Sequence, residues 1–357
     1  MSAPALRVAV LGAGTVGLEV VRGLVEDSDR LARRSGVQLE LVGIAVRDAD
    51  AAVRRGLPAA LLTDAPAHLV ADPATDVIVE LMGGDEPART LVAAALGAGK
   101  AVVTANKHIV AHHGAELEAI ARRAAAPFRF EAAVGGGTPV LGPLAAELAA
   151  TRVSAIRGIV NGTTNYILSA MTSEGRSYDE VLAAAQAAGY AEADPAGDVE
   201  GADAANKLVI LARLAFGTWL DPAAIVTTPL EGPGRGRPGI TGVTSADIES
   251  AAASALVVKL LATARRGDAE REGSSDVAGS VLPTLVPSDS PLGRTGGVLN
   301  RIEIDSDLLG TVAFEGPGAG GRATSSAVLA DLIAVARGAG STWAGLPPAE
   351  RALAAAR

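Results

Sequence analysis

The chain has 357 residues, which predicts two domains at roughly 150 residues per domain. Apolar residues make up 49% of the chain and charged residues 20%, so a sizeable core is available and a disordered chain is excluded. The net charge of −9 argues against a nucleic-acid partner. The sequence contains no cysteine, which excludes disulfides, thiolate nucleophiles and Cys-ligated metals.

The N-terminal residues run directly into an apolar strand pattern and leave no room for a secretory signal peptide. No apolar run approaches the roughly 18 residues that a membrane span needs, and the best candidate, residues 251–261, is interrupted by Lys259. We therefore expect a cytoplasmic protein without a membrane partner.

The first part of the chain alternates short β-branched runs with longer helical patterns, which is typical of a parallel sheet with crossover helices. The predicted strands are 7–11, 39–46, 76–81, 101–104 and 128–131, and the predicted helices are 14–32, 87–96 and 107–124. This pattern predicts an α/β fold that begins with a dinucleotide-binding domain over residues 1–137.

Helical patterns dominate from Thr138 onward. The predicted helices are 139–150, 165–172, 178–188, 202–216, 245–264 and 324–337, with strands at 156–160 and 301–304 and Gly/Pro-rich loops at 231–239 and 310–321. We expect a second, α+β domain over 138–322. The remaining residues, 323–357, form a C-terminal helix that could return to the first domain.

The strongest motif lies between the first strand and the first helix. Gly12, Gly14 and Gly17 form G-x-G-x-x-G, with Thr15 and Val16 between the second and third glycines. The first glycine permits a tight turn, the second lets the backbone approach a pyrophosphate, and the third lets the helix pack on the strand. The alternative is a glycine-rich turn without a ligand.

The end of the second strand bears on the choice between NAD and NADP. An acidic residue at this point usually contacts the ribose hydroxyls, but the sequence has Arg47 here. A guanidinium can bind a ribose 2′-phosphate through two parallel hydrogen bonds, which favours NADP. The alternative is a solvated surface pair between Arg47 and Asp48.

A strand that ends in Thr104 leads into a helix that starts near Lys107, at the carboxyl edge of the sheet where ligands bind. This position places Lys107 near a cofactor, although a lysine at a helix start is often only solvated. His108 and His112 have the i,i+4 spacing of metal ligands, but no third ligand is nearby, which favours surface or packing roles.

The segment Glu131 to Pro139 is a strand end that breaks into three glycines. Its exposed carbonyl oxygens, together with the Glu131 carboxylate, could surround a hard cation. The alternative is an interdomain hinge.

The densest cluster of charge is the segment from Gly189 to Lys207, which is rich in carboxylates and ends in a lysine. Asp203 and Lys207 are four residues apart and share a helical face. The helix continues in an apolar run, so its charged face needs a cavity or a ligand. The alternative is a weak helical salt bridge.

Taken together, these motifs resemble the homoserine dehydrogenase family over nearly the whole chain, from Arg7 to about Pro347. The resemblance rests on the glycine fingerprint, on Val103 to Lys107, on Glu131 to Pro139, and on three further segments. Those segments are Gly158 to Leu168, Gly189 to Lys207 and Gly316 to Gly321.

The resemblance implies a Rossmann-type domain and a catalytic and dimerisation domain, in a homodimer. It implies reversible NAD(P)-dependent interconversion of L-homoserine and L-aspartate 4-semialdehyde, on the route to threonine, methionine and isoleucine. The chain stops at Arg357, which suggests a short form without a C-terminal regulatory domain and no inhibition by L-threonine.

The resemblance also assigns roles to particular residues. Glu192 and Asp203 would bind the polar groups of the amino acid, Lys207 would transfer the proton, and Lys107 would lie beside nicotinamide and substrate. Gly189 and Gly318 would contact the cofactor through their backbone. A sodium ion would be bound by Glu131 and by the backbone of Val134, Gly136 and Thr138.

The chemistry agrees with a lysine in this role. Hydride transfer to an aldehyde leaves negative charge on oxygen, and an ammonium group both stabilises that charge and supplies the proton. In the reverse direction the lysine must be neutral, so its pKa must be lowered by burial or by a second cation, for which Lys107 is the candidate.

Two other interpretations remain. A dehydrogenase for another amino-acid aldehyde would retain the fingerprint but should lack the set of Glu192, Asp203 and Lys207. A non-catalytic NADP-binding sensor would lack the proton donor.

Overall fold

The computed structural model describes residues 5–267 and 277–351. The chain divides into two compact units. The first runs to Ala145 and resumes from Ala319 to Pro348, and the second runs from Ala146 to Gly318 and resumes at Ala349. From the sequence, we had placed these boundaries at residues 137 and 322 and had kept 323–357 as one segment.

The first unit is built on a six-stranded parallel sheet with the strand order β3-β2-β1-β4-β5-β6. Its strands are β1 (Ala5–Leu11), β2 (Gln38–Ala45), β3 (Leu62–Thr63), β4 (Val77–Glu80), β5 (Ala101–Thr104) and β6 (Phe128–Arg129). The order reverses between β1 and β4, which is where ligands bind in open α/β sheets. The structure confirms the predicted α/β class and its Rossmann-type sheet.

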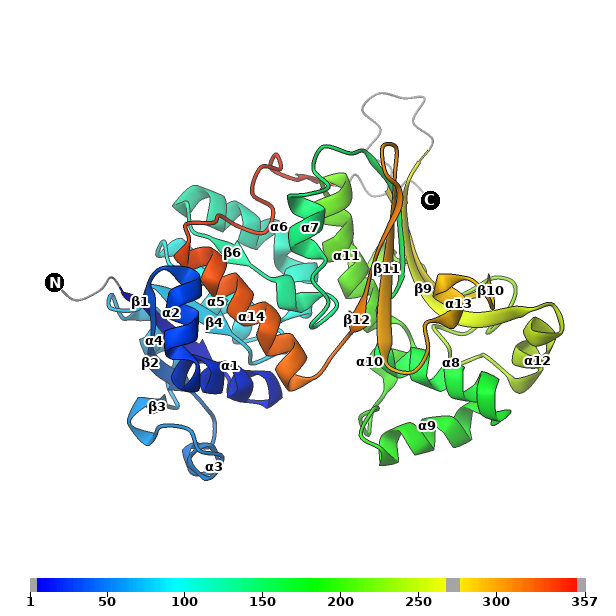
Figure 1. The fold of residues 1–357 in the computed structure, drawn as a ribbon, viewed down its shortest axis with the longest axis horizontal. Helices are drawn as coiled ribbons and strands as arrows, with labels where there is room; N and C mark the ends of the chain where they lie inside the picture. The colour runs from blue at the N-terminus through cyan, green and yellow to red at the C-terminus, as the bar shows by residue number, and fades with distance from the viewer. Residues whose placement is uncertain (1–4, 268–276, 352–357) are drawn as a thin grey trace. The chain divides into compact units, whose positions relative to one another are not determined.

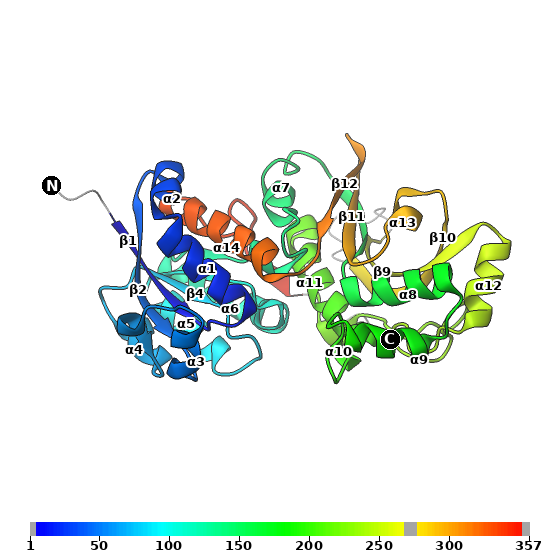
Figure 2. The ribbon, with the colours of Figure 1, turned by 60° about the horizontal axis from the view of Figure 1, so that its bottom comes forward.

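Helices cover this sheet on both faces. The helices of the first unit are α1 (Thr15–Glu26), α2 (Ser28–Ser35), α3 (Ala49–Arg54), α4 (Pro66–Ala71), α5 (Ala88–Gly97), α6 (Lys107–Ala124), α7 (Leu141–Ala145) and α14 (Gly321–Ala336). Helices α1 and α14 pack side by side, as do α5 and α6 (Figures 1 and 2). Because crossovers are right-handed, the strand order places α1 and α5 on opposite faces.

The core of the first unit follows from the composition of its central strands. Val8 and Val10 of β1, Val79 of β4 and Val103 of β5 are fully buried in one cluster. A strand that is covered on both faces needs such continuous β-branched runs.

The predicted helix 14–32 is two helices, since α1 ends at Glu26 and α2 begins at Ser28.

The second unit contains a five-stranded antiparallel sheet with the order β10-β9-β7-β11-β12. The strands are β7 (Val153–Ile159), β9 (Leu256–Arg266), β10 (Val277–Pro287), β11 (Leu299–Ser306) and β12 (Gly310–Pro317). A smaller parallel pair joins β8 (Thr218–Trp219) to β13 (Glu350–Arg351).

The helices of the second unit are α8 (Gly162–Glu174), α9 (Tyr178–Ala187), α10 (Ala196–Val199), α11 (Ala202–Phe216), α12 (Ser245–Ala253) and α13 (Pro291–Arg294). Helix α11 packs against β7, β9 and β10, and α8 and α9 lie side by side (Figure 2). The sheet therefore carries α11, on which the predicted Asp203 and Lys207 lie.

Two predictions for the second unit are wrong. The predicted helix 245–264 ends at Ala253, because Ala255 adopts a positive φ of 55° and the following apolar residues form β9. The predicted loop 310–321 contains β12, since Gly310 makes the turn (φ 66°) and the next residues pair with β11. Among the described residues, no helix is long and apolar enough to span a bilayer.

Candidate active site

The fingerprint glycines have distinct structural roles. A Cβ on Gly12 would lie 2.7 Å from the carbonyl oxygen of Leu81, and one on Gly17 would lie 2.0 Å from that of Gly12. Beside Gly14, by contrast, a Cβ would meet nothing within 4 Å. Gly12 and Gly17 are thus required by packing, whereas the space at Gly14 is open to a ligand. Thr15 and Val16 begin α1, whose N-terminal N–H groups suit a pyrophosphate.

Arg47 is exposed just beyond β2. It forms no ion pair with Asp48, whose carboxylate accepts a hydrogen bond from the Ala51 N–H at 2.8 Å and caps α3. Arg55 follows α3, and its guanidinium donates to the carbonyl oxygens of Ala13 (2.8 Å) and Gly14 (3.1 Å). This second positive charge at the fingerprint was not predicted from the sequence.

A buried carboxylate organises the ends of β4 and β5. Glu80 is fully buried and accepts hydrogen bonds from the Thr104 hydroxyl (2.6 Å) and from the backbone N–H groups of Met82 (2.8 Å) and Gly83 (3.2 Å). Burial raises the pKa of Glu80. The hydroxyl of Thr104, which we predicted to contact the cofactor, is thus engaged by Glu80 and also accepts from the Asn106 N–H at 2.9 Å.

Lys107 is the first residue of α6, and Asn106 caps that helix by accepting from the Ile109 N–H at 3.3 Å. The imidazole rings of His108 and His112 stack on each other, with their centroids 4.2 Å apart. Among the residues that the structure describes, no group of three or more His, Asp or Glu side chains is arranged to bind a metal.

Glu131 lies in a backbone cradle. It is 7% exposed, and its carboxylate accepts N–H groups of Val140 (2.8 Å), Leu141 (2.9 Å) and Gly142 (2.6 Å). Burial and the neighbouring Asp331 carboxylate raise its pKa. Most of the acceptor capacity of Glu131 is therefore used within the protein.

The predicted carbonyl ligands Val134, Gly136 and Thr138 are all buried. Within the described part of the chain, their carbonyl oxygens accept no backbone hydrogen bond, and the buried Thr138 hydroxyl has no partner. Carbonyl and hydroxyl oxygens without such donors are the kind of ligand that a hard cation takes, whereas the Glu131 carboxylate is already engaged.

Two predicted cofactor glycines belong to the second unit. Gly189 follows α9 with a φ of 77°, and its N–H donates to the Gln186 carbonyl at 3.1 Å. A Cβ on Gly318 would lie 2.3 Å from the side chain of Asn300, so close packing alone requires glycine there. The amide of Asn300 is fully buried and has no hydrogen-bond partner among the described residues.

The second unit brings Asp203 and Lys207 together. The Nζ of Lys207 donates to Asp203 Oδ2 at 2.8 Å and to the Val160 carbonyl oxygen at 2.6 Å, and Lys207 is only 8% exposed. The Nδ2 of Asn161 donates to Asp203 Oδ2 (2.8 Å) and to Asp198 Oδ1 (2.7 Å). We did not assign Asn161 or Asp198 to the site from the sequence.

Glu192 does not join this cluster through a hydrogen bond in the described residues. Its side chain is exposed, and its backbone carbonyl accepts from Gln186 Nε2 at 3.0 Å. Hydrogen bonds thus join the buried Lys207 and Asn161 to the half-buried Asp203 and Asp198 in the second unit.

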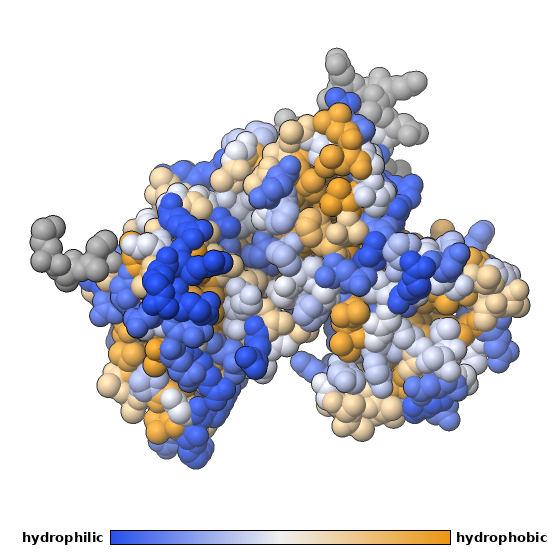
Figure 3. Space-filling model, viewed as in Figure 1, coloured by the Kyte–Doolittle hydropathy of each residue, from blue (hydrophilic) through white to orange (hydrophobic). Residues whose placement is uncertain are grey.

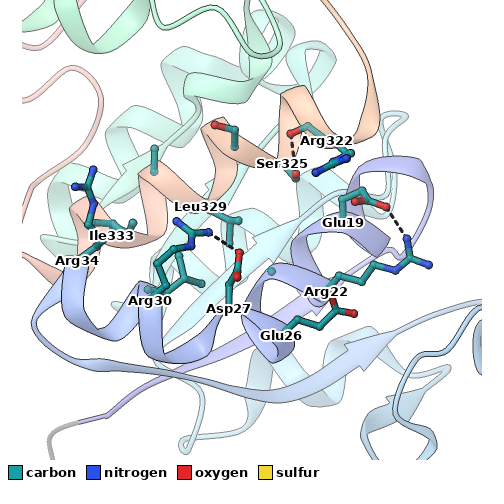
Figure 4. A pocket seen from close by; sticks show the side chains of 14 residues that line it. Glu19, Arg22, Glu26, Asp27, Arg30, Arg34, Arg322, Ser325, Leu329 and Ile333 are labelled. Carbon is teal, nitrogen blue, oxygen red and sulfur yellow. Dashed lines mark hydrogen bonds and ion pairs between the residues drawn. The ribbon is translucent and has the colours of Figure 1, made fainter.

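A groove of about 760 Å³ lies between α14 and the pair α1 and α2 (Figure 4). Arg22 and Arg30, which line it, are each paired with a carboxylate on a neighbouring turn, at 2.9 Å to Glu19 and 2.6 Å to Asp27. Figure 3 shows a strongly hydrophilic surface over α2. None of the predicted cofactor residues lines the groove, so we do not assign it to the site.

A Rossmann-type sheet with a glycine fingerprint at its first strand-to-helix turn is typical of NAD(P)-dependent oxidoreductases. Residues 12–131 match the family model described as the NAD-binding domain of homoserine dehydrogenase, and residues 139–333 match the homoserine dehydrogenase model. The chain belongs to the homoserine dehydrogenase family. It interconverts L-homoserine and L-aspartate 4-semialdehyde by hydride transfer, acting on a CH–OH group.

Relatives and solved structures agree with this assignment. The chain is 44% identical to homoserine dehydrogenase of Corynebacterium glutamicum, covering 97% of this chain and 77% of that protein. It is 46% identical to that of Mycobacterium leprae, covering 92% and 72%. The crystal structure of the enzyme from Thiobacillus denitrificans superimposes with a TM-score of 0.86 at 40% identity, covering 93% and 73%.

A hyperthermophilic archaeal homoserine dehydrogenase, solved in complex with NADPH, superimposes with a TM-score of 0.75 at 30% identity. The match covers 92% of this chain and 97% of that one. These comparisons decide against the two other interpretations, a dehydrogenase for a different aldehyde and a non-catalytic sensor.

Proposed function

We propose that Lys207 transfers the proton in this reaction. The observation that carries the proposal is the buried position of its Nζ, bonded to Asp203 Oδ2 and to the Val160 carbonyl oxygen. These two bonds use two of the three N–H groups of an ammonium and leave one for the substrate oxygen. In aldehyde reduction this N–H stabilises the developing negative charge and delivers the proton, and in homoserine oxidation the neutral amine takes the proton back.

Further roles follow for the neighbouring predicted residues. Asp203 orients Lys207, and Asp203 and Glu192 bind the polar groups of the amino acid. Lys107 orients the cofactor and the substrate. Its support is its position at the first turn of α6, at the carboxyl edge of the parallel sheet, where open α/β sheets bind ligands.

The cofactor is proposed to be NADP, with NAD as the weaker alternative. When bound, the nicotinamide supplies or accepts the hydride. The protein would bind the pyrophosphate at Gly14, Thr15 and Val16, and the ribose 2′-phosphate at Arg47, which is exposed and makes no ion pair within the described residues. The NADPH in the archaeal relative supports this choice. Gly189, Gly318 and Thr104 are proposed as further contacts.

A sodium ion is proposed at the carbonyl oxygens of Val134, Gly136 and Thr138, with Glu131 beside them. The support is the set of buried oxygens without backbone partners described above. Unfolding temperatures measured in sodium chloride and in choline chloride test this site. Equal temperatures in the two salts at matched ionic strength would remove it.

A homodimer is proposed to form through the second unit. Leu308 and Leu309, at the turn between β11 and β12, are 71% and 56% exposed, and β12 is an edge strand that a second copy can cover. We place the enzyme in the cytoplasm, on the route to threonine, methionine and isoleucine. Sedimentation of the purified protein tests the dimer.

The proposed function is tested by measuring the rate of nicotinamide oxidation or reduction from its absorbance, with L-aspartate 4-semialdehyde or L-homoserine as substrate. Lys207→Ala should lower kcat by about 10² to 10⁴-fold, the usual contribution of general acid–base catalysis. NADPH affinity, measured by fluorescence quenching, should stay near that of the unchanged protein, because Lys207 is not among the proposed cofactor contacts. If Lys207→Ala retains most of its turnover, Lys207 is not the proton donor.

A further inference from the structure

Asn161 lies between β7 and α8 and is the N-cap residue of α8. Its side chain is 4% exposed and uses every hydrogen-bonding group that it has. The Oδ1 atom accepts from the Thr164 N–H at 2.9 Å and from the Thr164 hydroxyl at 3.0 Å. The two N–H groups donate to two different carboxylates, Asp198 and Asp203.

These contacts close a ring around the proposed proton donor. From Lys207 Nζ one hydrogen bond runs to Asp203 Oδ2, which also accepts from Asn161 Nδ2. The backbone continues from Asn161 to the preceding residue, Val160, whose carbonyl oxygen accepts the second hydrogen bond of Lys207. The adjacent residues Val160 and Asn161 therefore determine both hydrogen bonds of Lys207: Val160 accepts one directly, and Asn161 holds Asp203, which accepts the other.

We propose that Asn161 is a positioning residue for proton transfer, which holds Asp203 and Asp198 so that Lys207 keeps one N–H directed at the substrate oxygen. The inference rests on the proposed role of Lys207. An amide suits this position because it can satisfy two carboxylates without adding charge, whereas a third carboxylate would repel both of them. The amide orientation is fixed, since its oxygen must face the Thr164 N–H.

The capping role and the positioning role can be separated by substitution. Asn161→Ser and Asn161→Asp both keep a side-chain oxygen that can cap α8, since serine and aspartate are good N-cap residues. Both lose the two N–H donors. Ser177→Ala is the matched control, because Ser177 caps α9 in the same unit by accepting from Glu180 N–H and makes no contact with Lys207.

Asn161→Ser should lower kcat for aldehyde reduction by about ten- to a hundredfold, the scale of a small misplacement of a catalytic group. Asn161→Asp should also move the pH profile of homoserine oxidation upward by about one pH unit, because added negative charge favours the protonated lysine. Ser177→Ala should lower the unfolding temperature and change neither kcat nor the pH profile. NADPH affinity should be the same in all three variants.

The inference is wrong if Asn161→Ser and Asn161→Asp both bind NADPH, keep kcat within twofold and show an unchanged pH profile. If Asn161→Asp does not fold, Asn161→Ser alone decides on kcat. Lys207→Ala, assayed in parallel, shows whether the proposed role of Lys207 or only the positioning role of Asn161 is wrong. An active Lys207→Ala removes the proposed function itself, whereas an inactive Lys207→Ala beside unaffected Asn161 variants removes only the positioning role.

Discussion

Arg47 and Arg55 lie near the same end of the parallel sheet but have different neighbours. Arg47 is exposed beyond β2, whereas the Arg55 guanidinium is bonded to the carbonyl oxygens of the fingerprint loop. Arg47→Ala should therefore weaken NADP binding by about ten- to a hundredfold, since a charge-assisted contact contributes about 1.5 to 3 kcal/mol, and should barely affect NAD. Dissociation constants from fluorescence quenching measure both effects.

Arg55→Ala is the companion variant. Because Arg55 supports the loop that meets the pyrophosphate, which NAD and NADP share, its loss should weaken both cofactors by a similar factor. Equal losses of both cofactors in Arg47→Ala would remove the assignment of Arg47 to the 2′-phosphate.

The site residues that could be predicted from the sequence act within a local turn, whereas those that could not act through partners distant in the chain. The fingerprint glycines are predictable because their roles depend on a local turn between one strand and one helix. Arg55, Glu80 and Asn161 act through partners that are 42, 24 and 42 residues away in the chain. No local pattern reveals such partners, although a buried polar residue at the end of an apolar strand marks Glu80 and Asn161 as candidates.

Strand β9 forms from a segment whose local pattern predicts a helix. Residues 245–264 are rich in alanine and fit a helical pattern, and short apolar runs do not distinguish a buried helix from a buried strand. Pairing with β10 along all eleven residues and with β7 on the other side outweighs that local preference. The same reason explains β12, whose glycines suggested a loop.

Strand β9 also carries a buried charge. Lys259 is 4% exposed, and its Nζ donates to the Thr295 carbonyl oxygen (2.7 Å), Asn165 Oδ1 (3.1 Å) and Ser169 Oγ (3.4 Å). All three acceptors are uncharged, and none of the described residues forms an ion pair with Lys259. Burial accordingly lowers the pKa of Lys259 from 10.5 to about 8.

We expect the buried Lys259 to make the protein more stable as the pH rises through the alkaline range. Between pH 8 and 10.5 the unfolded chain binds the proton more tightly than the folded protein does, so the free energy of unfolding rises with pH as the cost of burying the charge is relieved. From pH 7.5 to 9.5 this contribution amounts to about 2 kcal/mol. Urea unfolding at both pH values measures it.

Lys259→Met is the variant that isolates the effect. The stability of this variant at either pH depends on whether the three acceptors form other hydrogen bonds. Its free energy of unfolding should, however, not rise between pH 7.5 and 9.5. A rise of the same size in Lys259→Met would show that other groups cause it.

The first unit is built from two separate stretches of the chain. The chain leaves it after Ala145 and returns at Ala319. Polar contacts bind the returning segment to the sheet: Asp331 accepts from the Glu131 N–H at 2.8 Å and from Arg129 Nε at 2.6 Å. Trp343 packs against Phe128 and Phe130, with ring centroids 5.6 and 5.5 Å away. The sequence predicted a helix here that could return to the first domain, but local patterns did not reveal its partners.

Because the first unit contains two stretches of the chain, we expect NADPH binding to protect backbone amides in both stretches from hydrogen exchange. NADPH at 100 times its dissociation constant should stabilise the unit that binds it by about 2.7 kcal/mol, which slows the exchange of its most protected amides about a hundredfold. Because α14 packs against α1 and is bonded to Glu131, amides of α14 should gain this protection together with those of α1 and β1. Hydrogen exchange followed by mass spectrometry measures each segment. Amides of β9 and β10 serve as the internal control and should gain much less, since these strands lie in the second unit and contain no proposed cofactor contact. Protection confined to residues before Ala145, with α14 exchanging as fast as it does without NADPH, would contradict the assignment of the returning segment to the cofactor-binding unit.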